Sequence, residues 1–212
     1  MYPDTALEIE IWETGARFIA GIDEVGRGPL AGPILAASVV FPAYTSSEKI
    51  PGLRDSKMMS PNLRCRVAPL IQEVALGIGI GRVNPADIDR IGIAAAGRLA
   101  MERALDNLPV AVDYLLIDAF PLSYNQLPCT AVTHGDSVSI SIAAASVIAK
   151  VARDIIMQGF ASKYPGYGFE RHKGYPTREH LQLLSKLGPS NIHRKSFAPV
   201  RTSLEGTNTT GF

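Results

Sequence analysis

The alternation of apolar and polar positions along the chain predicts a mixed α/β protein. Short apolar runs bounded by glycine, proline or polar residues have the length of β-strands, and the first two lie close enough in sequence to pair antiparallel. These runs are 18–25, 33–41, 77–83 and 114–118. Longer stretches in which apolar residues recur every three or four positions are typical of amphipathic helices. They are 61–74, 93–108, 140–160 and 177–187, with a further helix start at Asn84-Pro85.

The first apolar run ends in two adjacent carboxylates, Asp23 and Glu24, followed by Gly26, Arg27 and Gly28. An unpaired buried carboxylate is costly, so a buried strand has little reason to end in this way. Because neighbouring strand residues point to opposite faces, the two acids reach one site only if the backbone leaves the ladder there. The glycines permit that departure and a close approach of backbone N–H groups to a ligand. The alternative is a surface turn with two solvated acids.

Two further carboxylates occupy comparable positions. Asp118 ends the apolar run 114–118, and open sheets bind their ligands at the carboxyl ends of strands. Asp136 lies just ahead of the helix 140–160, where exposed N–H groups favour a carboxylate. Asp118 as a turn residue and Asp136 as a helix cap remain the alternatives. Asp154 would lie more than about 20 Å along the same helix, so we expect an ion-pair role for it.

Composition sets the class of protein. The chain has 212 residues, of which 46% are hydrophobic and 19% charged, enough for one domain with a full core. No apolar run reaches the roughly 18 residues of a membrane span, and no export signal precedes the first strand. We therefore expect a cytoplasmic protein without membrane contact, with reduced thiols at Cys65 and Cys129. The predicted divisions are an N-terminal arm 1–16, a catalytic core 17–162, a basic aromatic-rich helical segment 163–201 of the same domain, and a flexible tail 202–212.

The net charge is only +1, but three of the four histidines and many basic residues follow residue 162. Tyrosines and a phenylalanine alternate there with Arg171, His172, Lys173, Arg194 and Lys195. Basic residues mixed with aromatic ones suit phosphate contacts combined with stacking or sugar contacts. The alternative is a solvated basic segment whose aromatic side chains pack on the core.

The four acids, Asp23, Glu24, Asp118 and Asp136, indicate which chemistry the protein performs. Asp23, Glu24 and Asp118 have no cationic neighbour other than Arg27, so a cluster of these acids without a cation would be strongly repulsive. Oxygen ligands suit Mg²⁺ or Mn²⁺, and two such ions stabilise the attacking and leaving oxygens of a phosphodiester displacement. The residues thus favour a metal-dependent nuclease. The alternative is a catalytically silent nucleic-acid-binding module.

Seven motifs in order along the chain resemble those of bacterial ribonuclease HII, the type 2 ribonuclease H. They are DEVGRG at 23–28, DSK at 55–57, LID at 116–118, GDS at 135–137, IAAASVIAK at 142–150, KGY at 173–175 and HRKSF at 193–197. The resemblance implies an RNase H-like fold, with a mixed five-stranded sheet flanked by helices and a small helical C-terminal part. It implies an endoribonuclease that cleaves the RNA strand of RNA/DNA hybrids and the 5′ side of ribonucleotides embedded in duplex DNA. The expected ends are a 3′-hydroxyl and a 5′-phosphate.

The resemblance also implies roles for single residues. The two-metal carboxylates are Asp23, Glu24, Asp118 and Asp136. The backbone of Gly26, Arg27 and Gly28 is expected to contact the 2′-OH, and Tyr175 the adjoining deoxyribose, which suits an aromatic ring. The resemblance also implies phosphate contacts from Lys57 and from Ser139 or Ser146. Further substrate contacts, from Arg171, His172 and Lys173, are expected from the basic, aromatic composition of their segment.

The sequence departs from the family pattern at His134, where a lysine usually precedes Gly-Asp, and at 119–121, the residues after Asp118. These departures affect nearby substrate contacts but not the cluster. A sister enzyme, ribonuclease HIII, is expected to carry an additional N-terminal substrate-binding domain, for which residues 1–17 give no room. The C-terminus lacks the glutamine and paired aromatics of a sliding-clamp peptide, and we expect a monomer.

Overall fold

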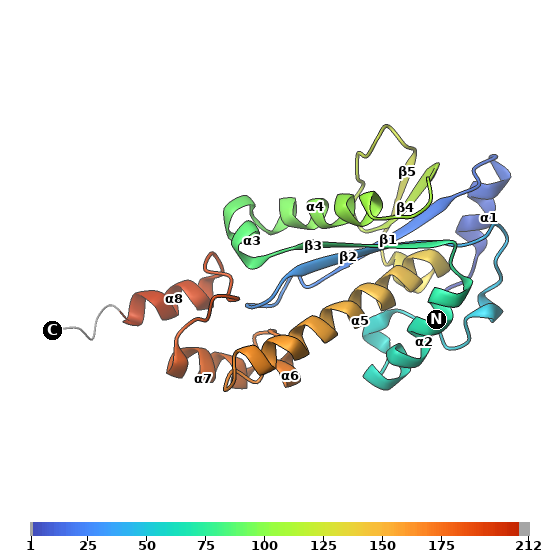
Figure 1. The fold of residues 1–212 in the computed structure, drawn as a ribbon. Helices are drawn as coiled ribbons and strands as arrows, with labels where there is room; N and C mark the ends of the chain where they lie inside the picture. The colour runs from blue at the N-terminus through green and yellow to red at the C-terminus, as the bar shows by residue number, and fades with distance from the viewer. Residues whose placement is uncertain (1, 208–212) are drawn as a thin grey trace. The chain divides into compact units, whose positions relative to one another are not determined.

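The computed structural model describes residues 2–207 (Figure 1). The chain forms two compact units, each assembled from three stretches of sequence. The sheet unit contains the described residues up to Val25, Leu35–Arg82 and Arg98–Val151. The helical unit contains Gly26–Ile34, Val83–Gly97 and the described residues from Ala152 on. The divisions predicted from the sequence, at residues 16, 162 and 201, instead separate consecutive segments.

The regular elements begin and end as follows. The strands are β1 Ile19–Val25, β2 Ile34–Val40, β3 Gly77–Val83, β4 Tyr114–Asp118 and β5 Cys129–Val132. The helices are α1 Ala6–Glu13, α2 Pro61–Val74, α3 Pro85–Ile91, α4 Ile93–Asp106, α5 Ile140–Lys163, α6 Phe169–His172, α7 Arg178–Leu187 and α8 Ala198–Thr207. No helix within residues 2–207 is long and apolar enough to cross a membrane.

The structure confirms the strands and helices predicted from hydrophobic patterning, and it adds four elements. The predicted arm contains α1, and β5 and α6 are only four residues long, too short for a periodic pattern. The tail was expected to be flexible from residue 202, but α8 continues to Thr207, so that prediction is wrong for 202–207. Residues 208–212 lie outside the described part of the chain.

The five strands form one mixed sheet in the order β3-β2-β1-β4-β5 (Figure 1). β1 pairs antiparallel with β2 and parallel with β4, which in turn pairs parallel with β5. This arrangement confirms the predicted fold class. The two central strands, β1 and β4, therefore end at the same edge of the sheet, and both end in acidic sequence.

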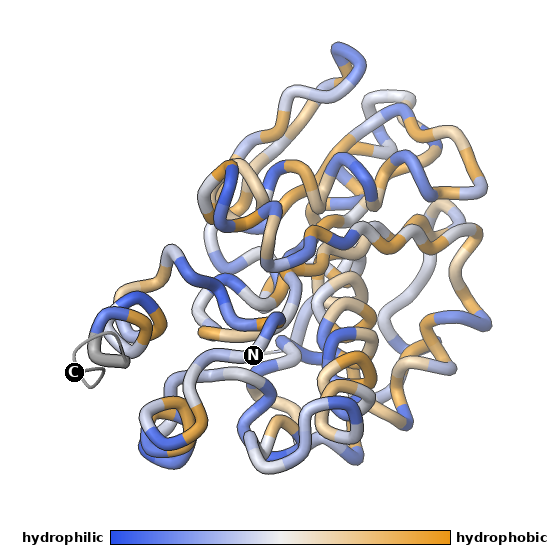
Figure 2. Tube along the Cα trace, turned by 60° about the vertical axis from the view of Figure 1, so that its left-hand side comes forward, coloured by the Kyte–Doolittle hydropathy of each residue, from blue (hydrophilic) through white to orange (hydrophobic). Residues whose placement is uncertain are grey.

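Helices cover both faces of the sheet within the sheet unit (Figure 1). On one face, α2 and the first half of α5 pack against Ala37 and Val39 of β2. On the other face, the Ser38 hydroxyl donates a hydrogen bond to the carbonyl of Ala104 in α4. Figure 2 shows hydrophobic and hydrophilic residues alternating along the helices, as expected when one side of each helix is buried.

The helical unit has two small apolar clusters of its own. One joins Ala31 to Met157 in the second half of α5 and to aromatic and aliphatic side chains that follow α5 along the chain. The members of that cluster are Ala31, Met157, Tyr167, Phe169 and Ile192. The second cluster packs Leu30 against Leu184 of α7 and Val200 of α8. The loop 29–32 therefore contributes apolar side chains to both clusters.

The close contact between β3 and α4 predicts that the stability of the fold depends on glycine at position 81. A Cβ atom on Gly81 would lie 1.8 Å from the carbonyl oxygen of Ala100, so the helix backbone would have to move. We expect Gly81→Ala to lower the free energy of unfolding by about 1–3 kcal/mol, the usual cost of overpacking.

The control is Gly159→Ala in α5, where no atom lies within 4 Å of the added Cβ. This substitution should be neutral or stabilise by up to about 1 kcal/mol, because alanine is the better helix former. Urea unfolding midpoints of both variants and the parent protein measure the effect. A Gly81→Ala midpoint equal to that of the parent would contradict the close contact.

Candidate active site

Three carboxylates converge in the sheet unit. Asp23 comes from β1, Asp118 is the last residue of β4, and Asp136 lies in a short 3-10 helix, Gly135–Ser137, just before α5. One carboxylate oxygen from each residue lies within 4.8 Å of the other two. Asp23 and Asp136 are buried and Asp118 is half-buried. The structure thus brings together three of the four acids that the sequence analysis selected.

Strand register explains why Asp23 meets Asp118. Ile22 of β1 pairs with Ile117 of β4 in a parallel ladder, so the same register continued by one residue sets the two aspartates side by side. A Cβ on Gly21 would meet Ser141 of α5, which shows that Gly21 faces α5. Side chains two residues apart share a face, and Asp23 therefore lies on the α5 face as well.

Glu24 does not belong to the group of three. Asp23 and Glu24 could converge on one site only if the backbone left the ladder there, but the antiparallel pairing with β2 continues through Val25. The pleat directs neighbouring side chains to opposite faces. The backbone leaves the ladder after Val25, at Gly26, whose φ of +97° is rarely adopted by residues other than glycine. The role of Glu24 as a metal ligand stays a prediction.

The cluster is electrostatically strained. Burial raises the pKa of Asp23 well above its usual value, and the neighbouring charges of Glu24, Asp118 and Asp136 raise it further. Lys57 acts in the opposite direction: its Nζ lies 3.0 Å from the Oδ2 atom of Asp136. Sequence reasoning found no cation beside these acids except Arg27, because Lys57 is distant in sequence.

Lys57 and its neighbour Asp55 complete the surroundings of Asp136. Partial burial disfavours the charged form of Lys57, but its hydrogen bond to Asp136 and the nearby carboxylates outweigh this effect and raise its pKa. Burial also raises the pKa of Asp55, although its carboxylate accepts a hydrogen bond from the Lys57 backbone N–H. Asp55 was not among the predicted site residues. Its position in the DSK motif was the available signal.

The donor set fits a divalent cation. All three side chains offer carboxylate oxygens, the ligands preferred by Mg²⁺ and Mn²⁺. Burial first, and repulsion from the neighbouring acids second, raise the pKa of Asp23, and a bound cation would offset both effects. Gly135 N–H donates to the Oδ1 atom of Asp118 at 2.8 Å and so orients this carboxylate. The turn before Gly135 is made by His134, which adopts a left-handed conformation with φ of +56°.

The two predicted serine contacts lie inside the fold. Ser139 is fully buried, and its hydroxyl donates to the Oε1 atom of Glu8. Ser146 is also buried, and its hydroxyl shares a 2.6 Å hydrogen bond with that of Ser56. A phosphate contact from either serine would require exchange of these internal partners. Their role in substrate binding therefore stays a prediction.

The glycine-arginine loop and Tyr175 lie together in the helical unit. Gly28 is exposed, and a Cβ on it would lie 4.0 Å from the Cε1 atom of Tyr175. Tyr175 keeps 37% of its surface exposed. The predicted 2′-OH reader and the predicted deoxyribose contact are thus neighbours within one unit.

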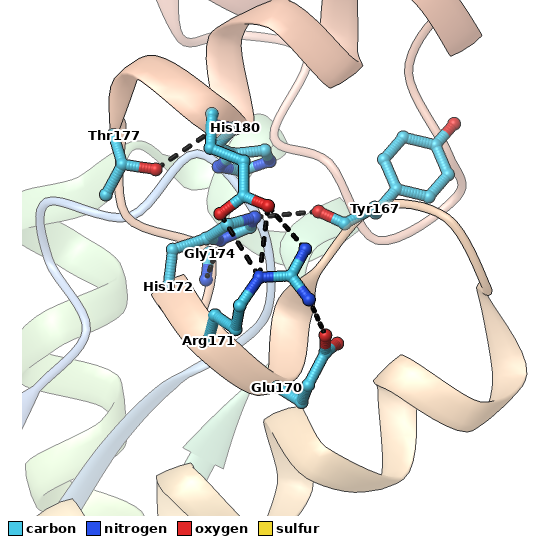
Figure 3. A network of polar contacts seen from close by, with 8 residues as sticks. Tyr167, Glu170, Arg171, His172, Gly174, Thr177 and His180 are labelled. Atoms are coloured by element: carbon cyan, nitrogen blue, oxygen red, sulfur yellow. Dashed lines mark hydrogen bonds and ion pairs between the residues drawn. The ribbon is translucent and has the colours of Figure 1, made fainter.

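The basic residues before Tyr175 have internal partners (Figure 3). Arg171 is exposed and forms ion pairs with Glu170 and Glu179. Lys173 Nζ donates to the Glu170 carbonyl at 2.8 Å. His172 is buried and contacts main-chain atoms. Phosphate contacts by Arg171, His172 and Lys173 stay predictions, and the first two would require rearrangement.

Known proteins resemble this chain over most of its length. A family model described as Ribonuclease HII matches residues 20–200. The ribonuclease HII of Synechococcus sp. (strain JA-3-3Ab) is 47% identical over 199 residues, which cover 94% of this chain and 90% of that protein. The chain belongs to the ribonuclease HII family. It is accordingly a type 2 ribonuclease H, a class of metal-dependent hydrolase.

Solved structures support the fold of this ribonuclease HII family member. The ribonuclease H2 of Pyrococcus horikoshii OT3 aligns with a TM-score of 0.77 at 24% identity, over 91% of this chain and 100% of that one. Bst-RNase HIII, solved in complex with Mn²⁺, aligns with a TM-score of 0.70 at 19% identity, over 91% of this chain and 71% of that one. At these identities the comparison establishes the RNase H-like fold alone.

The strained cluster predicts that Asp23→Asn stabilises the protein at neutral pH. Because the folded-state pKa of Asp23 is raised, its ionised form costs stability at high pH, and that cost disappears as the pH falls towards the unfolded pKa, about 3.9. In buffer with EDTA, the variant should unfold at higher urea concentration than the parent at pH 7, and the difference should shrink at pH 4.5.

The exposed Glu10→Gln in α1 serves as the control for removing a negative charge. It should give no comparable gain. A variant Asp23→Asn that is less stable than the parent at pH 7 would mean that repulsion does not dominate at this site.

Proposed function

We propose that the protein cleaves the RNA strand of RNA/DNA hybrids and also cuts duplex DNA on the 5′ side of an embedded ribonucleotide. The observation that supports this most directly is the convergence of Asp23, Asp118 and Asp136 within 4.8 Å in a member of the ribonuclease HII family. Asp23 and Asp118 lie near the carboxyl ends of two neighbouring strands, where open sheets bind their ligands, and Asp136 joins them from the 3-10 helix before α5.

In this proposal Asp23, Asp118 and Asp136, with Glu24, would hold two Mg²⁺ or Mn²⁺ ions. Such ions, when bound, would activate a water molecule and stabilise the developing charge on the phosphate oxygens. The side chain of Lys57 is 73% exposed, so its ammonium group would be accessible to a substrate phosphate beside Asp136. The water oxygen bonds to phosphorus while the bond from phosphorus to the 3′ oxygen breaks. This yields a 3′-hydroxyl and a 5′-phosphate.

Selection of the bond is assigned to the helical unit. The backbone at Gly26–Arg27–Gly28 reads the 2′-OH, which is the group that distinguishes RNA from DNA. Tyr175 packs against the next sugar, which lacks that group. The proximity of Gly28 to the Tyr175 ring and the exposure of both support this division. A monomeric state and a cytoplasmic location stay predictions, and the last five residues, relevant to a clamp peptide, lie outside the described chain.

The first experiment tests the metal cluster. Asp118→Asn should lower cleavage of a duplex that contains one ribonucleotide by more than about 100-fold, because losing a metal ligand should exceed the 10–100-fold effect of outer-shell partners. The exposed Asp106→Asn in the same unit serves as the control and should leave cleavage unchanged. Equal cleavage with Mg²⁺ and with EDTA would contradict the proposal, and binding without any cleavage would favour a silent binding module.

The second experiment separates the two recognition elements. Gly28 has no positive φ and has room for a methyl group, so Gly28→Ala should fold like the parent yet cleave every ribonucleotide substrate poorly. Tyr175→Ala should lower kcat/KM for a single-ribonucleotide duplex relative to an RNA/DNA hybrid by about tenfold or more, given about 1–3 kcal/mol for such contacts. An unchanged ratio in Tyr175→Ala would place junction reading elsewhere.

A further inference from the structure

Two buried side chains, His193 and Arg194, connect the segments to which the proposed function assigns substrate recognition. Both residues belong to the helical unit, as do Gly26–Gly28 and Tyr175. His193 is 1% exposed and Arg194 is fully buried. Neither side chain faces a substrate, and the function described so far uses neither.

The side chain of Arg194 donates four hydrogen bonds, all to main-chain carbonyls. Its guanidinium binds the carbonyls of Gly26 at 2.6 Å, Arg27 at 3.0 Å and Gly32 at 2.9 and 3.0 Å. A planar fork of five N–H donors is the side chain best suited to bind several carbonyls at once. Burial lowers the pKa of Arg194 to about 9, and it still carries its charge at neutral pH. The loop therefore closes around a fixed cation.

This arrangement determines where the loop amides point. In a trans peptide the C=O and the following N–H lie on opposite sides of the bond, and the described chain contains no cis peptide. The carbonyls of Gly26 and Arg27 point inward at Arg194. The N–H groups of Arg27 and Gly28, which belong to the same peptide units, must therefore point away from Arg194. These are the amides that the proposed function assigns to the 2′-OH.

His193 reaches Tyr175 through a second histidine. The Ser190 N–H donates to His193 Nδ1 at 2.9 Å, so the proton of neutral His193 is on Nε2. That Nε2–H donates to His180 Nε2 at 3.1 Å, which leaves the His180 proton on Nδ1. The Nδ1–H then donates to the Tyr175 carbonyl at 2.9 Å. The chain of bonds is consistent in one direction only.

The histidines are neutral at physiological pH, as this chain requires. Burial lowers the pKa of His193 to about 4 and also lowers the pKa values of His180 and His172. His172 stacks on His180, accepts a hydrogen bond from Gly174 N–H, and contacts the carbonyl of Tyr167 (Figure 3). The turn that presents Tyr175 is thus hydrogen-bonded by two stacked, uncharged imidazoles.

The main chain joins the same segments. Arg194 N–H donates to the Leu30 carbonyl, and Leu30 N–H donates to the Gly174 carbonyl, both at 2.8 Å. Ala31 pairs with His193 in an isolated bridge. The loop after β1, the turn before Tyr175 and the segment around His193 therefore form one bonded framework.

We propose that His193 and Arg194 are positioning residues that set the register between the amides reading the 2′-OH and the aromatic ring reading the next sugar. Because the two residues are adjacent in the chain, the spacing between their partners is fixed by one peptide bond. Arg194 aims the loop amides, and His193, through His180, places Tyr175. The inference rests on the proposed function and assigns its selectivity to two residues that do not touch the substrate.

His193 is tested with two amide side chains, each of which places a polar group near one of the two imidazole nitrogens. His193→Asn can keep the bond to Ser190 but does not reach His180, whereas His193→Gln can extend a donor to His180. For each variant, kcat/KM is measured on a single-ribonucleotide duplex and on an RNA/DNA hybrid, and their ratio is compared with that of the parent. We expect a tenfold lower ratio for His193→Asn and a ratio within threefold of the parent for His193→Gln.

The ratio is the informative quantity because both substrates are measured on one preparation. A merely structural role would lower the folded fraction and reduce both activities equally. If His193→Asn does not fold, the variants His180→Gln and His180→Asn test the same chain of hydrogen bonds at its next member. Only asparagine, the shorter amide, retains a donor near the Tyr175 carbonyl. There the lower ratio is expected for His180→Gln.

Arg194 is tested by binding without metal. Arg194→Lys keeps the charge but loses the planar fork. We expect the ratio of its affinity for a ribonucleotide-containing duplex to its affinity for an all-DNA duplex to fall at least fivefold. A parent protein that cleaves neither substrate would refute the proposed function itself. An active parent, with ratios unchanged in His193→Asn and affinities unchanged in Arg194→Lys, would overturn the positioning role alone.

Discussion

The parallel pairing of β1 with β4 is the constraint on which the site depends. It places Asp23 and Asp118 next to each other on the face covered by α5, and the helix start then supplies Asp136. Packing three acids so closely opposes folding, and the ammonium group of Lys57, which donates a hydrogen bond to Asp136, offsets this only in part. The sheet therefore enforces a geometry that the charges by themselves would avoid, as a site built for cations requires.

The acids could be predicted from the sequence because each stands at the end of a regular element. Asp118 follows a four-residue apolar run, and Asp136 precedes a long periodic helix. The separation of Glu24 from the other three could not be predicted, since it depends on how far the ladder with β2 continues. The pairing of Lys57 with Asp136 could not be predicted either, because the two residues are 79 positions apart and tertiary packing brings them together.

Composition was a poor guide to the C-terminal basic residues. Arg194 belongs to the basic, aromatic-rich segment that suggests phosphate binding, yet it is fully buried and bonded to carbonyls. Arg153 is similar: its guanidinium binds the carbonyls of Pro33, Ala31 and Lys173. A count of positive charges cannot tell a surface cation from one that organises a loop. Only the placement of main-chain acceptors distinguishes the two.

The hydrogen bonds of Arg194 have a consequence for the order of events during synthesis on the ribosome. The bond to Gly26 joins residues 168 positions apart. The loop after β1 is therefore made early but receives its internal partner only when most of the chain has emerged, and contacts of such separation form late. A truncated chain that already contains the three aspartates would lack the hydrogen bonds that hold this loop. If the loop reads the substrate as proposed, selectivity is the last property that the growing chain acquires.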